Sequence, residues 1–334
     1  MSLSRLLATI GDQILDPSIV FSFDRTGFNR HKLSFTSTDL DVDMTGRVCA
    51  VTGANSGLGK ATAKAFAQRG AEVWMLCRNR ERAEKARDEL ISETGNNNIH
   101  VSIVDVGDLE SVRAFIEHWQ VTAVDVLVHN AGVLPQQRTD SPQGIETTLS
   151  INLVGPLALT AGLIQRLQSG SKPRIIWVSS GGMYSQKLRL DHLENPPGNF
   201  DGVKAYARTK RAMVMASARL ADELKHTGIA VHCMHPGWAN TKGVRDSIPG
   251  FWKVTRMILR SPEEGADTIV WLGVNDHAHD RSGLFWFDRK PRSTHLLPGT
   301  QSSQTTRDEV WLRIHQLAGI NPHEWAQPQQ KDSS

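Results

Sequence analysis

The sequence predicts an α/β protein in which a parallel, doubly wound sheet of about seven strands is flanked by helices. From Gly46 onward, short apolar runs alternate with segments of helical spacing. The apolar runs do not alternate with polar residues, as expected for strands covered on both faces. A glycine-rich turn also separates the first strand from the first helix. In such a sheet, right-handed crossovers bring the carboxyl ends of the strands to one edge, where ligands bind.

The strands and helices are expected to follow one another within a single domain at residues 45–325. We expect strands at residues 47–53, 71–78, 99–106, 123–132, 174–180, 229–237 and 283–288. We expect helices at residues 60–70, 79–95, 109–119, 149–167, 206–225 and 262–273. The first of these helices is rich in alanine and ends at Gly70, a residue type that commonly terminates helices.

Residues 1–44 depart from this pattern and are expected to form an N-terminal arm. Six apolar residues share one face at helical spacing before Pro17 limits the helix: Leu3, Leu6, Leu7, Ile10, Ile14 and Leu15. This helix either packs on the protein's own surface or contacts a membrane or a partner through residues 1–16. Few Lys or Arg residues accompany it, which weakens the membrane interpretation. Residues 23–46 show no strong period, and residues 326–334 are expected to be flexible.

Composition and cysteine usage limit the classes of function. The 38 basic and 35 acidic residues give a net charge of +3, and no long Lys/Arg cluster suggests a nucleic-acid partner. Cys49, Cys77 and Cys233 lie in or beside apolar runs, so we expect buried, reduced thiols and a reducing compartment. No apolar run is expected to reach the roughly 18–20 residues of a membrane span. No secretory signal is recognised, so we expect a cytoplasmic protein, with membrane association left open. We assign no metal site.

The stretch "TGANSGLG" at residues 52–59 predicts a dinucleotide site. Gly53, Gly57 and Gly59 lie between a strand and a helix. Glycines allow the backbone to turn tightly and to approach a pyrophosphate, which is also stabilised by the helix N-terminus. The alternative is a turn in which the glycines serve packing alone.

The ends of the second and third strands bear on which cofactor is bound. An NAD site has an Asp or Glu at the end of the second strand to bind the ribose, whereas this chain has Cys77 and Arg78. An arginine can pair with a 2′-phosphate that an acid would repel, so the sequence favours NADP(H) over NAD(H). Alternatively, Arg78 is a solvated residue. Asp105 either accepts a hydrogen bond from the adenine or caps a helix.

The stretch "YARTK" at residues 206–210 predicts an acid/base pair. Tyr206 and Lys210 share one helix face, and an ammonium near a phenol lowers the pKa of the phenol toward neutrality. Ser179 and Ser180 end a strand at the ligand edge, where a hydroxyl can hold a substrate oxygen. Asn152 can anchor a water molecule that links Lys210 to solvent. Each residue alone also has a structural interpretation: half-buried aromatic, turn former or helix cap.

In this order and spacing, the motifs resemble those of the short-chain dehydrogenase/reductase family over about residues 45–290. They are "TGANSGLG", "HNAG" (129–132), Asn152, "VSS" (178–180), "YARTK" and "HPG" (235–237). The resemblance implies a Rossmann-type fold of the non-extended branch. It also implies a catalytic tetrad of Asn152, Ser180, Tyr206 and Lys210, with Ser180 preferred over Ser179. "TGANSGLGKATAKAFAQRGAEVWMLCRN" is similar to the retinol-dehydrogenase-like members.

The motifs and the resemblance together predict the cofactor contacts. The expected cofactor-binding residues are Gly53, Asn55, Ser56, Gly57, Leu58, Gly59, Arg78, Asp105, Val106, Asn130, Ala131, Gly132, Tyr206, Lys210, Pro236, Gly237 and Thr241. Two departures from the family pattern are present. His129 replaces the first Asn of the usual Asn-Asn-Ala-Gly, and Ser180 and Tyr206 are 26 positions apart, wider than usual. The retinol-dehydrogenase-like group shares this insertion, and Tyr184 within it has no Lys four residues later.

The function that these features predict is NADP(H)-dependent hydride transfer between the nicotinamide and a carbonyl or alcohol. The expected substrate lid at residues 238–262 is apolar, which favours a lipophilic substrate, unless the lid packs only on its own domain. Its apolar residues include Trp238, Phe251, Trp252, Met257, Ile258 and Leu259. Arg289, Lys290 and Arg292 form either an exposed basic loop or a contact to an anionic group.

The rival interpretation is a non-turnover protein that binds NADP(H) as a sensor, or that scaffolds a partner through its N-terminal arm. The complete tetrad argues against it. Family members often form homo-oligomers through helices beside the Tyr-bearing one, and the arm can block or extend such packing, so the oligomeric state stays open.

Overall fold

The structure is a computed structural model that describes residues 19–196, 198, 200–321 and 325. An eight-stranded sheet forms its centre, in the order β3-β2-β1-β4-β5-β6-β7-β8. The strands are β1 (Val48–Thr52), β2 (Glu72–Cys77), β3 (Ile99–Ile103), β4 (Val126–His129), β5 (Arg174–Val178), β6 (Ala230–Met234), β7 (Phe285–Phe287) and β8 (Lys290–Pro291). All neighbouring pairs are parallel except β7 and β8. The predicted doubly wound parallel sheet is therefore confirmed.

The eighth strand is an addition to the expected count of about seven. It arises because the chain turns back on itself directly after β7. Asp288 and Arg289 occupy this two-residue turn with φ of 49° and 58°. Left-handed φ at both central positions suits the right-handed twist of a tight hairpin, so the short antiparallel β8 pairs with β7.

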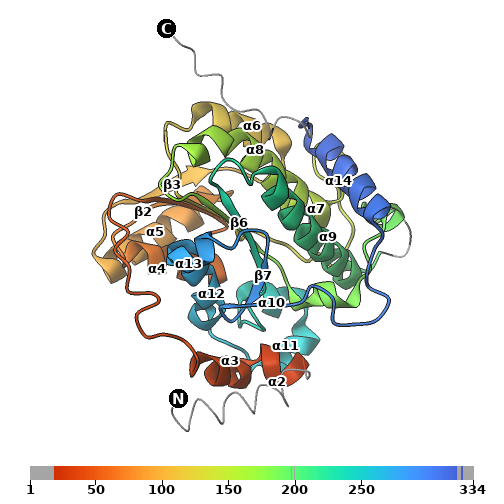
Figure 1. Cartoon of the computed structure of the whole chain (residues 1–334), viewed down its shortest axis with the longest axis horizontal. Helices are drawn as coiled ribbons and strands as arrows, with labels where there is room; N and C mark the ends of the chain where they lie inside the picture. Colours follow the sequence, from red (N-terminus) through yellow and green to blue (C-terminus); the bar gives the residue numbers. More distant parts are fainter. Residues whose placement is uncertain (1–18, 197, 199, 322–324, 326–334) are drawn as a thin grey trace.

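Two layers of helices cover the sheet (Figure 1), and each layer packs on its own apolar core. On one face lie α4 (Gly57–Ala67), α5 (Arg80–Thr94), α12 (Pro262–Val274) and α13 (Asp276–His279). On the other lie α6 (Leu109–His118), α7 (Thr147–Leu149), a π-helix (Ser150–Val154), α8 (Gly155–Gln168) and α9 (Gly202–Glu223). The strand order reverses between β1 and β4, and this switch point creates the crevice where doubly wound sheets bind ligands.

The apolar run from Thr147 to Gln168 corrects one expectation. The run has 22 residues, and its most apolar 18-residue window has a mean hydropathy of 1.5, so it is long and apolar enough for a membrane span by length and composition. Yet 72% of its apolar window is buried inside the fold. The run comprises α7, the π-helix and α8, which pack in the core, so its apolar character is that of a central helix.

A C-terminal helix, α14 (Gln304–Ala318), was not predicted from the sequence. It packs on α8 and α9, and the indole Nε1 of Trp311 donates a hydrogen bond to Glu223 in α9 at 2.9 Å. Val310, Trp311 and Ile314 are buried on this face. α14 therefore lies beside α9, the helix that carries Tyr206 (Figure 1). Family members often form homo-oligomers through helices next to this one, and in this chain α14 occupies such a position.

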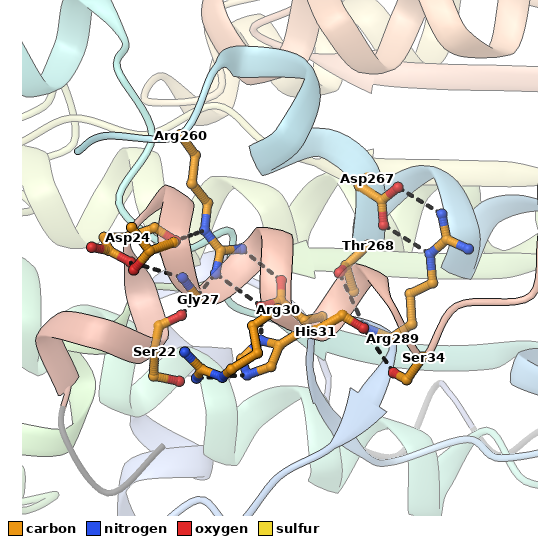
Figure 2. Close-up of polar contacts among 12 residues, drawn as sticks. Ser22, Asp24, Gly27, Arg30, His31, Ser34, Arg260, Asp267, Thr268 and Arg289 are labelled. Atoms are coloured by element: carbon orange, nitrogen blue, oxygen red, sulfur yellow. Dashed lines mark hydrogen bonds and ion pairs between the residues drawn. The ribbon is translucent and has the colours of Figure 1, made fainter. Parts of the chain in front are cut away.

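The described part of the N-terminal arm contains two short helices, α2 (Ile19–Phe23) and α3 (Arg25–Lys32), where no regular period was seen in the sequence. The side chain of Asp24 caps α3 by accepting a hydrogen bond from the amide of Gly27 at 2.9 Å. Figure 2 shows this cap beside Arg260, which lies 236 positions after Asp24 in the sequence. The amphipathic helix expected before Pro17 and the tail at residues 326–334 lie outside the described residues.

Arg289, in the basic segment after β7, forms internal ion pairs, and Lys290 and Arg292 are half-buried. The guanidinium of Arg289 lies 2.6 Å from Asp267 (Figure 2). It also lies 3.4 Å from Asp39, and its side chain is buried. Lys290 forms part of β8, and Arg292 lies over the ring of Phe287. The anionic group that Arg289 contacts therefore belongs to this chain.

The three cysteines are free and buried, as predicted. Burial raises the pKa of Cys77 to about 11 and that of Cys233 to about 12. Both thiols are therefore protonated at neutral pH, and neither is activated as a nucleophile.

Candidate active site

The turn between β1 and α4 contains Gly53, Gly57 and Gly59, and larger residues at these positions would be strained or would clash with neighbouring atoms. We call this turn the glycine cradle. Gly53 and Gly57 have φ of +67° and +55°, a region that residues with a Cβ rarely adopt. A Cβ at Gly59 would lie 2.5 Å from the carbonyl oxygen of Gly53. Ser56 precedes α4 but makes no side-chain cap, so the first amides of this helix are available to an anion. The cradle fits a pyrophosphate.

A hydrogen-bonded cluster fixes the cradle to the centre of the sheet. The side-chain amide of Asn130 donates to the carbonyl of Thr52 at 2.9 Å. The Thr52 hydroxyl accepts from the backbone amides of Asn130 and Ala131, each at 3.0 Å. The end of β4 is thereby joined to the end of β1. His129, which replaces an Asn of the family motif, is buried and bonds Thr160 at 2.7 Å, so it has a structural role here.

Asn152 lies within the π-helix, a local widening that often marks functional sites. Its side chain is buried and held at both ends by the backbone of one residue. The carbonyl oxygen accepts from the amide of Val133 at 2.8 Å, and the amide group donates to the carbonyl of Val133 at 3.1 Å. Both Asn152 Oδ1 and Lys210 Nζ would lie within 4 Å of a Cβ at Gly132, so the two side chains converge there. The side chain predicted to anchor a water is thus already paired with Val133.

Ser179 and Ser180 follow β5 but have different surroundings. Ser179 is buried, and its hydroxyl donates to the backbone carbonyl of Lys210 at 3.2 Å. Ser180 is partly exposed, caps the short 3-10 helix Gly181–Ser185, and forms a side-chain hydrogen bond with Tyr206. The second serine is therefore the one adjacent to the phenol.

Tyr206 and Lys210 lie in α9, which begins at Gly202, one turn earlier than expected. The Lys210 ammonium donates to the carbonyl of Val178 at 2.7 Å and lies 5.5 Å from the centre of the Tyr206 ring. The helix thus brings both groups to the carboxyl end of β5, beside Ser180. The sequence order Asn152, Ser180, Tyr206, Lys210 becomes one cluster in space.

The acid/base properties of this pair differ from the simple expectation. Burial raises the pKa of Tyr206, and the hydrogen bond with Ser180 offsets only part of that increase. Burial lowers the pKa of Lys210 to about 8. A neighbouring ammonium was expected to lower the pKa of the phenol, but this is not the dominant effect. Both groups lose hydration, and burial disfavours the charged form of each.

The loop after β6 borders the glycine cradle. A Cβ at Gly57 would lie 3.3 Å from the Thr241 side chain, so Thr241 stands directly over the turn. Gly237 has a φ of +74°, and Arg260 fills the space where a Cβ would lie. Thr241 also caps α10 (Lys242–Ser247) through its hydroxyl. The predicted contacts after β6 thus meet the predicted contacts after β1.

The remaining predicted cofactor residues lie along the same edge of the sheet. Arg78 is exposed directly after β2. Asp105 follows β3 and accepts from the amide of Gly107 at 2.9 Å, whereas Asp108 is the residue that caps α6. The helix-cap interpretation of Asp105 is therefore wrong. Leu58 packs against α12 at Gly265. Asn55, Ser56, Val106, Ala131, Gly132 and Pro236 occupy the turns that follow β1, β3, β4 and β6.

The expected lid contains α10 and α11 (Pro249–Thr255). Its apolar residues are not all buried. Leu259 is fully buried, whereas Met257 is 84% exposed and Val254 is 85% exposed. Trp238 packs edge-on against Phe251, and the Trp252 indole donates to Asn240 at 2.9 Å. The lid is thus tied to the loop after β6, and part of its apolar surface is exposed to solvent.

Comparison with known proteins identifies the family of this chain. The short chain dehydrogenase family profile matches residues 47–249. The chain belongs to the short-chain dehydrogenase/reductase family, whose members are oxidoreductases that use nicotinamide nucleotides. Dehydrogenase/reductase SDR family member 12 of Homo sapiens is 42% identical over 299 residues, which cover 89% of this chain and 94% of that protein. Retinol dehydrogenase 12 of Bos taurus is 32% identical, covering 84% of this chain and 89% of its own.

Several solved structures share the fold. An uncharacterised protein from Mycobacterium paratuberculosis superposes with a TM-score of 0.69 at 25% identity, covering 86% of this chain and 98% of its own. L-sorbose reductase from Gluconobacter frateurii, solved with NADPH and L-sorbose, has a TM-score of 0.60 at 26% identity, covering 74% and 96%. Short-chain dehydrogenase/reductase architecture therefore extends over most of this chain.

Sequence reasoning missed two residues that contact the site. His235 lies within the "HPG" motif, but only the proline and glycine were assigned a role. No local sequence pattern indicated a role for Phe23 of the arm, because its contacts are to residues more than 150 positions away. Its ring contacts the rings of His235 and Phe287. Among the described residues, no group of three or more His, Cys, Asp or Glu side chains is arranged to hold a metal ion.

Proposed function

We propose that this chain is an NADP(H)-dependent oxidoreductase that transfers hydride between the nicotinamide and a carbonyl or alcohol group. The observation that carries the proposal is the cluster of Ser180, Tyr206 and Lys210 beside the glycine cradle. A phenol, a hydroxyl and a buried ammonium at this edge form the set that carbonyl reduction needs: one proton donor, one orienting group and one cation. The family membership supports this reaction class.

Each residue of the cluster has a role that follows from its surroundings. When bound, the nicotinamide cofactor supplies hydride to a carbonyl carbon or accepts it from an alcohol carbon. Ser180 holds the substrate oxygen, and Tyr206 donates its proton to that oxygen in the reduction direction. The raised pKa of Tyr206 keeps the phenol protonated, as a proton donor must be. Asn152, within the π-helix, fixes the Val133 backbone.

The positive charge near the site belongs to Lys210. Its ammonium lies 5.5 Å from the centre of the Tyr206 ring and is positioned by the carbonyl of Val178. When Tyr206 loses its proton, the adjacent ammonium stabilises the phenolate that forms. In this proposal Lys210 also binds the ribose hydroxyls of the cofactor, as the resemblance to the family implies.

We expect Arg78 to determine the preference for NADP(H) over NAD(H). Arg78→Glu removes the cation that pairs with the 2′-phosphate, so NADPH affinity should fall about tenfold to a hundredfold, and NADH affinity should change much less. Fluorescence titration of both nucleotides measures the two constants. Arg87→Glu makes an equal charge change within α5 and is the matched control. An equal loss of affinity for NADPH and NADH would refute the assignment.

The substrate is proposed to be lipophilic, because the lid carries the buried Leu259 and the aromatic pair of Trp238 and Phe251. NADPH oxidation should therefore be assayed with aldehydes and ketones of increasing chain length, and with quinones. We expect kcat/KM to rise by up to about fourfold per methylene that enters the pocket. Rates that are independent of chain length would exclude a lipophilic substrate.

The same assay separates the enzyme from a non-turnover sensor or scaffold. Tight NADPH binding with no oxidation across the whole panel would favour the sensor. The cluster of Tyr206, Lys210 and Ser180 favours the enzyme, since a sensor needs no proton donor beside the cofactor. Membrane contact through residues 1–16 falls outside the described residues, and vesicle binding of the full chain tests it directly.

A further inference from the structure

The turn that carries Ser180 is packed from beneath by two residues outside the tetrad. A Cβ at Gly181 would lie 2.5 Å from the Phe23 ring and 2.9 Å from Nε2 of His235. Phe23 and His235 themselves meet edge to face, with ring centres 4.3 Å apart. Both residues are buried, at 5% and 2% exposure. The Ser180–Gly181 turn therefore packs directly against the Phe23 and His235 rings, which leave no space for a side chain at position 181.

A single hydrogen bond links His235 to this turn. The backbone amide of Gly181 donates to Nδ1 of His235 at 3.0 Å. Because an amide N–H can only donate, Nδ1 must be the unprotonated nitrogen of the ring. Burial lowers the pKa of His235 to about 3, so the ring remains a neutral acceptor at physiological pH. Its stacking on Phe287, with ring centres 5.1 Å apart, fixes the plane in which Nδ1 points.

Phe23 comes from the N-terminal arm, outside the segment that matches the family. Its carbonyl accepts from the amide of Trp238 at 2.8 Å, and its ring packs on Phe287 at 5.1 Å. The arm is held in place by Arg260, whose guanidinium donates to the carbonyls of Ser22 and Asp24 at 2.9 and 3.1 Å (Figure 2). Phe23 thus touches the serine turn and the loop after β6 together.

We propose that His235 and Phe23 are positioning residues that set the location of Ser180, so that the N-terminal arm completes the active site. The kinetic part of this inference rests on the proposed function. His235 acts through the Gly181 amide, and Phe23 closes the space beneath it. A loss of either contact lets the turn move, and displacements of about 1 Å cost up to a hundredfold in rate.

The first test removes and restores the acceptor. His235→Leu leaves the Gly181 amide unpaired, so we expect kcat to fall about tenfold to a hundredfold with little change in NADPH affinity. His235→Asn returns an oxygen to the position of Nδ1 and should recover most of that loss. His232→Asn, an equally buried histidine of β6, is the control for disturbance of the strand.

A double-mutant cycle with Ser180→Ala separates positioning from general packing. If His235 acts through Ser180, then His235→Leu should cost less than about twofold in the Ser180→Ala background. An equal factor in both backgrounds would overturn the inference. The arm is tested by Phe23→Leu, for which we expect a kcat loss of at least about tenfold. Phe21→Leu, at an exposed position of the same helix, should leave kcat unchanged, and equal losses for both variants would overturn the role of Phe23.

A spectroscopic readout keeps the inference testable if no substrate is turned over. The chain contains two tyrosines, Tyr184 and Tyr206, so 3-fluorotyrosine labelling gives two ¹⁹F resonances that Tyr184→Phe assigns. Because Ser180 bonds the phenol of Tyr206, Ser180→Ala should shift the Tyr206 resonance. His235→Leu should shift it similarly, and His235→Asn should not. A Tyr206 resonance that responds to Ser180→Ala but not to His235→Leu overturns the inference without reference to activity.

Discussion

Replacing Tyr206 with phenylalanine should lower kcat about 10²–10⁴-fold while NADPH affinity changes by less than about twofold. The substitution removes the proton donor beside Ser180 and preserves the ring that packs against the Lys210 side chain. The Lys210 ammonium is the other acid of the cluster among the described residues, and it already donates a hydrogen bond to the carbonyl of Val178. Single-turnover oxidation of NADPH with the best lipophilic carbonyl measures the chemical step directly.

The matched control for this experiment is Tyr184→Phe. Tyr184 is buried, and its hydroxyl donates to the carbonyl of Ser293 at 2.9 Å, outside the cluster. Its loss should reduce stability modestly, by about the 0.5–1.5 kcal/mol of one hydrogen bond, and leave kcat within about twofold. If Tyr206→Phe retained the wild-type kcat, the phenol would not be the proton donor and the proposed mechanism would be wrong.

The sequence predicted the parts of the fold that depend on local pattern. The core strands are short apolar runs bounded by glycines and charges, so β1 to β7 were found with errors of a few residues. The order of Asn152, Ser180, Tyr206 and Lys210 predicted a cluster because the carboxyl ends of parallel strands meet at one edge. Electrostatics could not be predicted in the same way. Whether Tyr206 is acidified or not depends on burial, which a spacing of four residues does not reveal.

The helices that the sequence analysis missed differ in whether the local sequence carries a signal for them. α14 carried a readable signal, since Val310, Trp311, Ile314 and Ala318 follow helical spacing and form its buried face. The helices α2 and α3, with 5 and 8 residues, are too short to show a period, and isolated helices of such length are unstable in water. They are stabilised by distant residues, above all Arg260, and no local pattern can predict such a contact.

The buried ion pair that holds the arm leads to the second large expected effect. Asp288 accepts hydrogen bonds from Arg260 at 2.6 and 2.8 Å, and its carboxylate lies 2.5 Å from Nδ1 of His31. All three side chains are at most 2% exposed. Burial favours the neutral carboxyl, but Arg260 and the hydrogen bonds from His31 and Arg260 outweigh it and lower the pKa of Asp288. The carboxylate is therefore ionised at neutral pH and its stabilising contribution is lost as the pH falls through the lowered pKa.

Asp288→Asn should therefore lower the free energy of unfolding by about 3–5 kcal/mol, because it leaves the Arg260 guanidinium buried without a counter-charge. Denaturant titration at neutral pH measures the loss as a shift in midpoint. The control is Asp191→Asn, which removes an ion pair with Arg189 that is exposed on both sides, and it should leave the midpoint almost unchanged. Equal shifts for the two variants would show that burial of the pair is irrelevant to stability. Because Arg260 also bonds the carbonyls of Ser22 and Asp24, Asp288→Asn should loosen the arm and lower kcat in the fraction that stays folded.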